Sequence, residues 1–262
     1  MRIRMIAIAL LGLSMCAGCQ PPQLNRNGGG DRSSSTSAAQ VTRTPVAPDA
    51  SAGENTALTE LSRLPVKGRA AMTGYSRDQF GPAWTDDVAA PGGHNGCDTR
   101  NDILRRDLTA TALKPGSHGC TVLTGQLADP YTGRSIAFRR GSSTSAAAQI
   151  DHVVSLGDAW ATGAQLLTSA LRQDLANDPL NLSAVDGPAN VQKSDADAAS
   201  WLPANRTNRC TYVARQIGVK LKYRLWVVPA ERSAMARVLA ACPQQRIPTD
   251  SDAGVAVPAP QR

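Results

Sequence analysis

The sequence contains one long apolar run, and this run stands at the extreme N-terminus. It covers residues 5–15, eleven mainly apolar residues preceded by Arg2 and Arg4. A helix that spans a bilayer needs about twenty apolar residues, so a bundle of membrane spans is excluded. A basic segment followed by a short apolar run is typical of a signal peptide. We therefore expect the protein to be exported, and export constrains the fold because it favours disulfide formation.

Two cysteines, Cys16 and Cys19, follow the apolar run. Small residues before a cysteine resemble the lipobox of bacterial lipoproteins, in which that cysteine is acylated. Cys19 fits this pattern better, because Ala17 and Gly18 precede it. We expect residues 1–19 to be a lipoprotein-type signal peptide, with Cys19 lipidated and the protein held at the cell membrane through this lipid only. An ordinary cleaved secretory signal, which would release the protein, is the alternative.

The chain has six cysteines, and four of them lie outside the signal region. Four cysteines permit three disulfide pairings. We favour the pairing that is nearest in sequence, Cys97 with Cys120 and Cys210 with Cys242, and expect each bond to stabilise the fold by roughly 2–5 kcal/mol. A zinc site is the rival interpretation. None of the four stands in a C-x-x-C pair, however, and an oxidising compartment favours disulfides.

Composition divides the rest of the chain into one domain between two polar segments. Residues 20–68 are rich in Gly, Ser, Thr, Pro and Ala, which predicts a disordered tether because such a segment buries little apolar surface. Residues 243–262 predict a disordered tail for the same reason. The domain expected between them, residues 69–242, is long enough to build a hydrophobic core. The formal net charge of +7 is compatible with an anionic partner but does not establish one.

Hydrophobic patterning within this domain predicts a mixed fold in which helices predominate. Alternation predicts a strand over residues 134–139 and a partner strand over residues 147–154, across a turn at Gly141. Helical spacing of apolar residues predicts one helix over residues 156–174. Further helices are expected over residues 188–199, 206–217 and 229–241.

An ordered set of polar residues carries the functional signal. Asp151 and His152 end the second predicted strand, and Asn181 stands in a loop further along the chain. Asn190 and Lys193 follow in a predicted helix. None of these residues is informative alone, but their order on strand, loop and helix is.

Three segments, residues 150–154, 177–182 and 190–193, resemble the HNH, or ββα-metal, nuclease motif. The chain is more closely similar to the HNH domain at the C-terminus of GmrSD-type restriction endonucleases and to its secreted actinobacterial relatives. The resemblance spans most of residues 70–242. It implies an α+β fold, with a ββα-metal core, additional helices and disulfide staples.

The resemblance also implies a role for each residue of the set. His152 would be the general base, a task that suits an imidazole titrating near neutrality. Asp151 and Asn190 would bind a divalent metal, and two oxygen ligands suit Mg²⁺ or Mn²⁺ better than closed zinc coordination. Asn181 would fix the His152 ring, and Lys193 would face the substrate phosphate. The family commonly has histidine where Asn190 stands.

Each of these residues has a structural interpretation as well. Asp151 would cap the helix predicted over residues 156–174 or pair with an arginine, and Asn181 would form a turn. Asn190 and Lys193 would be ordinary polar residues on a helix surface.

From these features we expect an exported, metal-dependent HNH endonuclease that hydrolyses DNA without sequence specificity and needs no obligate protein partner. The alternative is a catalytically silent HNH-like module that binds nucleic acid or a cell-wall polymer. A hydrolase of another surface phosphodiester is the third interpretation, and it would use the same site.

Overall fold

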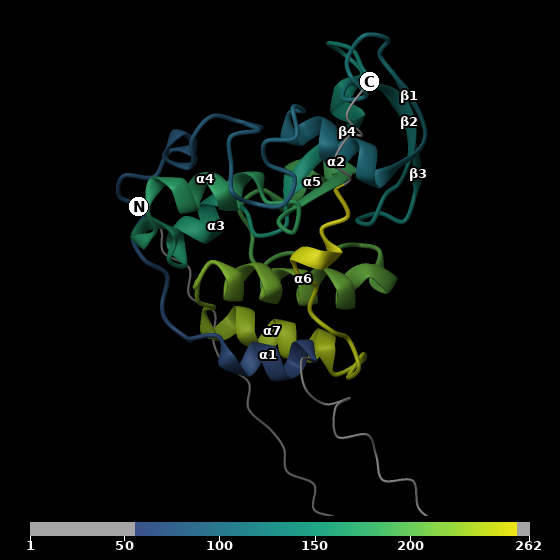
Figure 1. Ribbon diagram of the computed structural model, residues 1–262. Helices are drawn as coiled ribbons and strands as arrows, with labels where there is room; N and C mark the ends of the chain where they lie inside the picture. Colours follow the sequence, from purple (N-terminus) through teal and green to yellow (C-terminus); the bar gives the residue numbers. More distant parts are fainter. Residues whose placement is uncertain (1–55, 256–262) are drawn as a thin grey trace, which may run out of the picture. The chain divides into compact units, whose positions relative to one another are not determined.

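The computed structural model describes residues 56–255 (Figure 1). The predicted signal peptide, Cys19 and most of the predicted tether lie outside these residues, as do residues 256–262. Within residues 56–255, no helix is both long enough and apolar enough to cross a bilayer.

The described part of the chain is α+β, as expected. Its α-helices are α1 (Ala57–Arg63), α2 (Thr99–Asp107), α3 (Leu156–Ala161), α4 (Ser169–Asn177), α5 (Gly187–Lys193), α6 (Arg209–Lys222) and α7 (Pro229–Leu239). Its strands are β1 (Leu108–Leu113), β2 (Val122–Ala128), β3 (Ser135–Arg139), β4 (Ala148–His152) and β5 (Leu182–Asp186).

The strands form two antiparallel sheets, one of β1, β2 and β3 in that order and one of β4 and β5. The expected pairing of residues 134–139 with residues 147–154 is therefore wrong: β3 pairs with β2, and β4 pairs with β5. The burial of the strands explains this choice. Nearly all of β4 and β5 is buried, whereas β3 exposes most of its residues. Pairing β4 with β5 lets the buried backbone groups of the two strands hydrogen-bond to each other away from water.

The chain between β4 and β5 contains two helices where one was predicted. Helix α3 ends before Gly163, whose backbone φ of +129° is one that a side chain rarely permits. Helix α4 then begins after Thr168, whose hydroxyl accepts a hydrogen bond from the Leu171 amide. A helix stop and a new N-cap thus divide the region predicted as one helix over residues 156–174.

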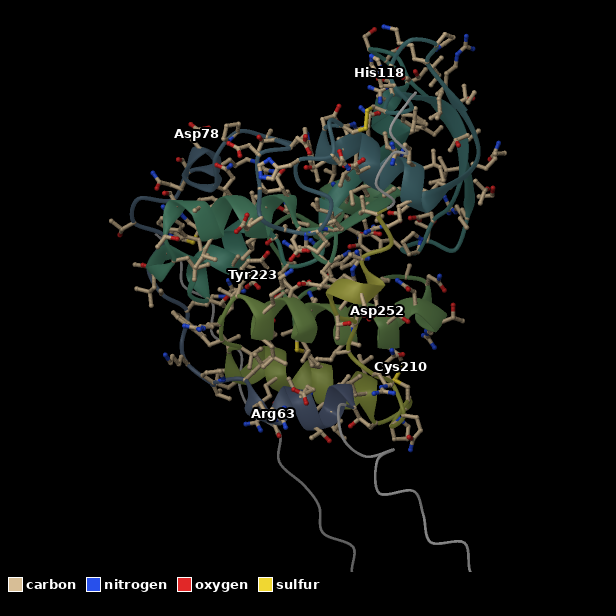
Figure 2. The ribbon with its side chains drawn as sticks, in the orientation of Figure 1. Arg63, Asp78, His118, Cys210, Tyr223 and Asp252 are labelled. Carbon is tan, nitrogen blue, oxygen red and sulfur yellow. A yellow bond between two sulfur atoms is a disulfide. The ribbon has the colours of Figure 1, made fainter. Side chains whose placement is uncertain are left out.

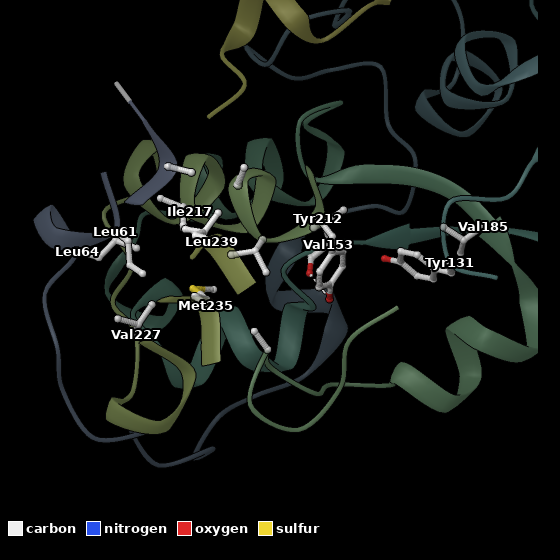
Figure 3. Close-up of a cluster of buried hydrophobic side chains, with 14 residues drawn as sticks. Leu61, Leu64, Tyr131, Val153, Val185, Tyr212, Ile217, Val227, Met235 and Leu239 are labelled. Carbon is white, nitrogen blue, oxygen red and sulfur yellow. Dashed lines mark hydrogen bonds between the residues drawn. The ribbon is translucent and has the colours of Figure 1, made fainter. Parts of the chain in front are cut away.

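Helices α1, α6 and α7 pack against one another and enclose the largest apolar cluster (Figures 1 and 3). Leu61 and Leu64 lie beside Ile217, Met235 and Leu239 in this cluster. Helix α1 falls within the predicted tether, so the tether boundary at residue 68 is wrong. Its sequence is short and flanked by polar residues, but its apolar side chains are buried against α6 and α7.

The predicted disordered tail also begins too early. The Gln245 carbonyl accepts a hydrogen bond from the Ala57 amide at 2.7 Å, and Ala253 is buried. Lys222 on α6 forms an ion pair with Asp250. The described residues after 242 therefore pack against α1 and α6. Composition does not predict this packing, because it depends on specific contacts with residues far away in the chain.

Both favoured disulfides are present (Figure 2). Cys97 and Cys120 connect the chain before α2 to the chain before β2. Cys210 and Cys242 connect the first turn of α6 to the chain that follows α7.

Candidate active site

Strands β4 and β5, followed by helix α5, form the ββα unit that carries all five candidate residues. Asp151 pairs with Ser183 across the two-stranded sheet, and His152 pairs with Leu182. Successive side chains of a strand point to opposite faces. The carboxylate of Asp151 therefore faces α5, and the imidazole of His152 faces the other side.

The Asp151 carboxylate is buried between two hydrogen-bond donors. The Lys193 Nζ lies 3.0 Å from Asp151 Oδ1 and 2.8 Å from the His152 carbonyl oxygen, and the Tyr131 hydroxyl donates to Asp151 Oδ2. Burial raises the pKa of Asp151, while Lys193 and Tyr131 oppose that rise. Lys193 is fully buried, so its ammonium group points into the protein rather than toward a substrate phosphate.

The His152 imidazole makes one hydrogen bond, between Nε2 and the Ala176 carbonyl oxygen at 2.9 Å. A carbonyl only accepts, so Nε2 carries the hydrogen and Nδ1 carries the lone pair. Burial lowers the pKa of His152 to about 3, and the positive charge of Arg77 acts in the same direction. The ring is therefore neutral at pH 7, with Nδ1 able to accept a proton.

A cavity of about 160 Å³ lies against the His152 ring. One wall comes from the chain between Arg77 and Trp84, which includes the short 3₁₀ helix Arg77–Phe80. The other wall comes from the ββα unit and its insertion, through His152, Leu156 and Ala176. The cavity is the size of a small group such as a phosphate with bound water.

Trp84 covers one face of the His152 ring. Its indole is stacked on the His152 imidazole, with ring centroids 5.9 Å apart and planes inclined by 14°. No local pattern around Trp84 indicates a site, so the sequence alone predicts no role for this residue. The contact is made across the fold, between the chain before α2 and the end of β4.

Asn181 lies near His152 and holds the loop that follows it. Its side chain is fully buried, accepts a hydrogen bond from the Val154 amide at 2.8 Å, and donates to the Val154 and Leu175 carbonyls at 3.2 Å. The Leu175 carbonyl immediately precedes Ala176, whose carbonyl holds the His152 ring. Asn181 thus fixes the backbone that follows His152 and the backbone next to the carbonyl that holds its ring, without a hydrogen bond to the ring itself.

Asn190 faces β4 from helix α5, but its partner is Gln149 rather than Asp151. The Asn190 amide donates to Gln149 Oε1 at 2.9 Å. The oxygens of Asp151, Asn190 and Gln149 are of the kind that Mg²⁺ prefers. The buried ammonium of Lys193, however, takes the place beside Asp151 where a cation would bind. An ion held jointly by Asp151 and Asn190 therefore does not fit this arrangement.

A second group of acidic residues, Asp158, Asp197 and Glu231, has carboxylate oxygens within 4.8 Å of one another. Lys220 lies 3.0 Å from Asp158 and 2.8 Å from Glu231, and Arg69 contacts Asp158 and Asp197. Burial raises the pKa of Glu231 to about 7. Each of these three carboxylates is already paired with Lys220 or Arg69, so we interpret the group as a buried charge network that joins α3, α6 and α7.

Comparison with known proteins gives two matches. The model of the GmrSD restriction endonuclease C-terminal domain matches residues 98–238. An uncharacterized secreted protein of Arthroderma benhamiae is 37% identical over 190 residues, which cover 72% of this chain and 85% of that protein. No solved structure matches. The range that matches the family includes the ββα unit with all five candidate residues, but not the wall formed by residues 77–84.

Proposed function

Because this chain belongs to the family of GmrSD restriction endonuclease C-terminal domains, we propose that it is an exported endonuclease that hydrolyses DNA phosphodiester bonds. The observation that carries the proposal is the state of His152. Its ring is neutral, is held through Nε2 by the Ala176 carbonyl, has Nδ1 left as the acceptor, and belongs to a residue that lines a cavity. The secreted relative supports export.

In the proposed reaction, His152 Nδ1 accepts a proton from a water molecule as the water oxygen attacks phosphorus. The bond between phosphorus and one ester oxygen then breaks, and the leaving oxygen takes a proton from solvent. A pKa of about 3 makes the ring a weak base while the cavity holds no anion. A bound phosphodiester adds negative charge beside the ring, which raises the pKa of His152 toward the range that suits a base.

GmrSD-type HNH nucleases usually depend on a metal ion, and Mg²⁺ or Mn²⁺ is the ion that oxygen donors would favour. No step is assigned to the ion, because Lys193 stands beside Asp151. Cleavage that EDTA abolishes would require a metal site other than the described arrangement of Asp151 and Lys193. Cleavage that persists in EDTA would show that the reaction needs no metal ion and that the Lys193 ammonium is the counter-charge of Asp151.

The principal alternative is a module that binds nucleic acid without cutting it. Such a module has no need for a neutral imidazole whose second nitrogen is left for a substrate. We therefore favour hydrolysis. We propose DNA as the substrate because the family is one of restriction endonucleases. Another phosphodiester at the cell surface could be hydrolysed by the same residues.

The test is cleavage of supercoiled plasmid by the purified protein with its disulfides formed, in Mg²⁺, in Mn²⁺ and in EDTA. His152→Ala is the active-site variant, and His118→Ala, at an exposed loop histidine, is its matched control. We expect nicking that His152→Ala abolishes and His118→Ala retains. Equal cleavage by wild type and His152→Ala would exclude His152 as the base, and DNA binding without cleavage by wild type would favour the binding module.

Membrane attachment through Cys19 is also proposed. Replacement of Cys19 by Ala is expected to move the protein from the membrane fraction to the medium. Retention of the variant in the membrane fraction would contradict lipid anchoring at this residue.

A further inference from the structure

One wall of the His152 cavity is formed by residues 77–84, which we call the N-terminal wall. It lies outside the range that matches the family, residues 98–238, yet it supplies most of the cavity lining. Whatever the cavity binds must therefore contact a segment that the family model does not cover.

The N-terminal wall is held firmly against the rest of the protein. Phe80 is buried beside Trp160 in the cluster around α3 and α4. The Arg172 guanidinium donates to the Gln79 carbonyl at 2.7 Å, and the Thr99 amide donates to the Trp84 carbonyl at 3.1 Å. The wall is therefore anchored near both ends.

Two backbone conformations show that the shape of this wall is constrained. Gly81 has a φ of +77°, and a Cβ there would lie 2.5 Å from the Gln173 side chain, so this turn favours glycine. Trp84 has a φ of +59°, which costs free energy for a bulky residue. Strain of this kind is often found at functional sites. Here it places the indole over the His152 ring.

Arg77 is the basic group of the wall. Its side chain is exposed at the cavity, and within residues 56–255 its guanidinium has no ion-pair or hydrogen-bond partner. Other arginines near the site are engaged: Arg106 pairs with Asp107, and Arg215 donates to the Leu180 and Leu182 carbonyls. A guanidinium without a partner beside a proposed base can bind a phosphate with two parallel hydrogen bonds.

Asp78 lies next to Arg77 on the same wall, and its exposed side chain lines the same cavity. The two side chains do not form a salt bridge, so the carboxylate does not neutralise the guanidinium directly. An anionic substrate would be attracted by Arg77 and repelled by Asp78. Replacing Arg77 and replacing Asp78 with neutral residues are therefore expected to change the affinity for an anionic ligand in opposite directions.

We propose that the N-terminal wall completes the active site, with Arg77 binding a backbone phosphate of the nucleic acid and Trp84 positioning the His152 ring. This inference rests on the proposed function and adds to it the residues that recognise the substrate. Arg77 is a binding residue. Trp84 is a positioning residue, because it touches His152 rather than the reacting atoms.

The binding test separates recognition from cleavage. Affinity for a fluorescein-labelled DNA duplex is measured by anisotropy in the His152→Ala background, at several salt concentrations. Arg77→Ala is expected to raise Kd at least about tenfold, because it removes a pair of charge-assisted hydrogen bonds to one phosphate. It is also expected to reduce the slope of log K against log salt by about one.

Three further variants serve as comparisons. Arg77→Lys keeps the charge and is expected to restore part of the affinity. Asp78→Asn is expected to lower Kd, opposite in sign to Arg77→Ala. Arg232→Ala, at an exposed position on α7 away from the cavity, is expected to leave Kd unchanged.

The outcomes distinguish this inference from the proposed function. Unchanged Kd and salt slope in Arg77→Ala, or no DNA binding by any form, would overturn the role of Arg77. Loss of binding in Arg77→Ala while wild type fails to cleave would support Arg77 and contradict the proposed nuclease. Cleavage by wild type with unaltered binding by Arg77→Ala would support the proposed nuclease and contradict the role of Arg77.

Trp84 is tested by comparing Trp84→Ala with Trp84→Phe in the cleavage assay. A positioning role predicts that Trp84→Ala lowers kcat at least tenfold with little change in KM, and that the flat ring of Phe restores most of kcat. Thermal unfolding monitors the fold of both variants. Equal kcat in Trp84→Ala and wild type, or a loss that Phe does not restore while the variant stays folded, would overturn this role.

Discussion

Lys193 Nζ and Asp151 Oδ1 lie 3.0 Å apart, and both side chains are buried where helix α5 meets strand β4. This ion pair joins the last turn of the helix to the end of the strand that carries His152. Lys193 also donates to the His152 carbonyl. The two residues predicted to serve a metal and a phosphate thus fix the backbone of the proposed base.

Replacement of Lys193 by Met is expected to lower the free energy of unfolding by about 3–5 kcal/mol, because it leaves the buried Asp151 carboxylate without its cationic partner. The double variant Asp151→Asn/Lys193→Met removes both charges and is expected to recover most of that loss. Urea denaturation gives both values. Equal stability of Lys193→Met and wild type would show that the pair is open in solution.

The buried His152 makes stability depend on pH. Its pKa is about 3 in the folded protein and near 6.5 when unfolded, so the unfolded state binds one more proton between these values. Stability should therefore rise with pH across this window, by about 1.4 kcal/mol per pH unit for this group, and level off above pH 6.5.

The contribution of His152 is isolated by comparison with His152→Gln, which cannot titrate. The difference in unfolding free energy between wild type and this variant is expected to grow in favour of wild type from pH 4 to pH 6.5. A difference that is constant across this range would mean that the ring is not buried in its neutral form.

Asn181 is expected to be sensitive to loss of its amide, because its side chain makes three hydrogen bonds to the backbone around His152. Asn181→Ala should cost about 2–4 kcal/mol, since it leaves buried backbone groups without partners. Asn181→Asp keeps the bond to the Val154 amide but loses both donors. If thermal unfolding shows no loss in Asn181→Ala, the loop does not depend on this side chain.

The disulfide between Cys210 and Cys242 closes the chain that contains α6 and α7. Its removal in the double variant Cys210→Ser/Cys242→Ser is expected to cost about 2–5 kcal/mol. Mass spectrometry of a non-reducing digest checks the pairing independently. A peptide linking Cys97 to Cys210 would contradict the described pairs.

Part of this fold is predictable from local sequence, whereas β1, β2, β5 and α2 match no predicted element. Alternating apolar residues indicate strands near β3 and β4, and the resemblance of the segments around Asp151, His152, Asn181 and Asn190 to the HNH motif implies a ββα unit. The pairing of β3 with β2 is not encoded locally, because it depends on which strands are buried on both faces. Helix α1 was missed because its stability comes from packing against α6 and α7 rather than from its own length.

The sequence by itself determined which residue types are available for the chemistry: a histidine next to an aspartate, two asparagines at family spacing, and four cysteines outside the signal region. Only the tertiary structure decided how they are used. Strand alternation turns Asp151 toward Lys193 and His152 toward the cavity, and the fold brings Arg77 and Trp84 to that cavity. These contacts join segments far apart in the chain, so no local pattern specifies them.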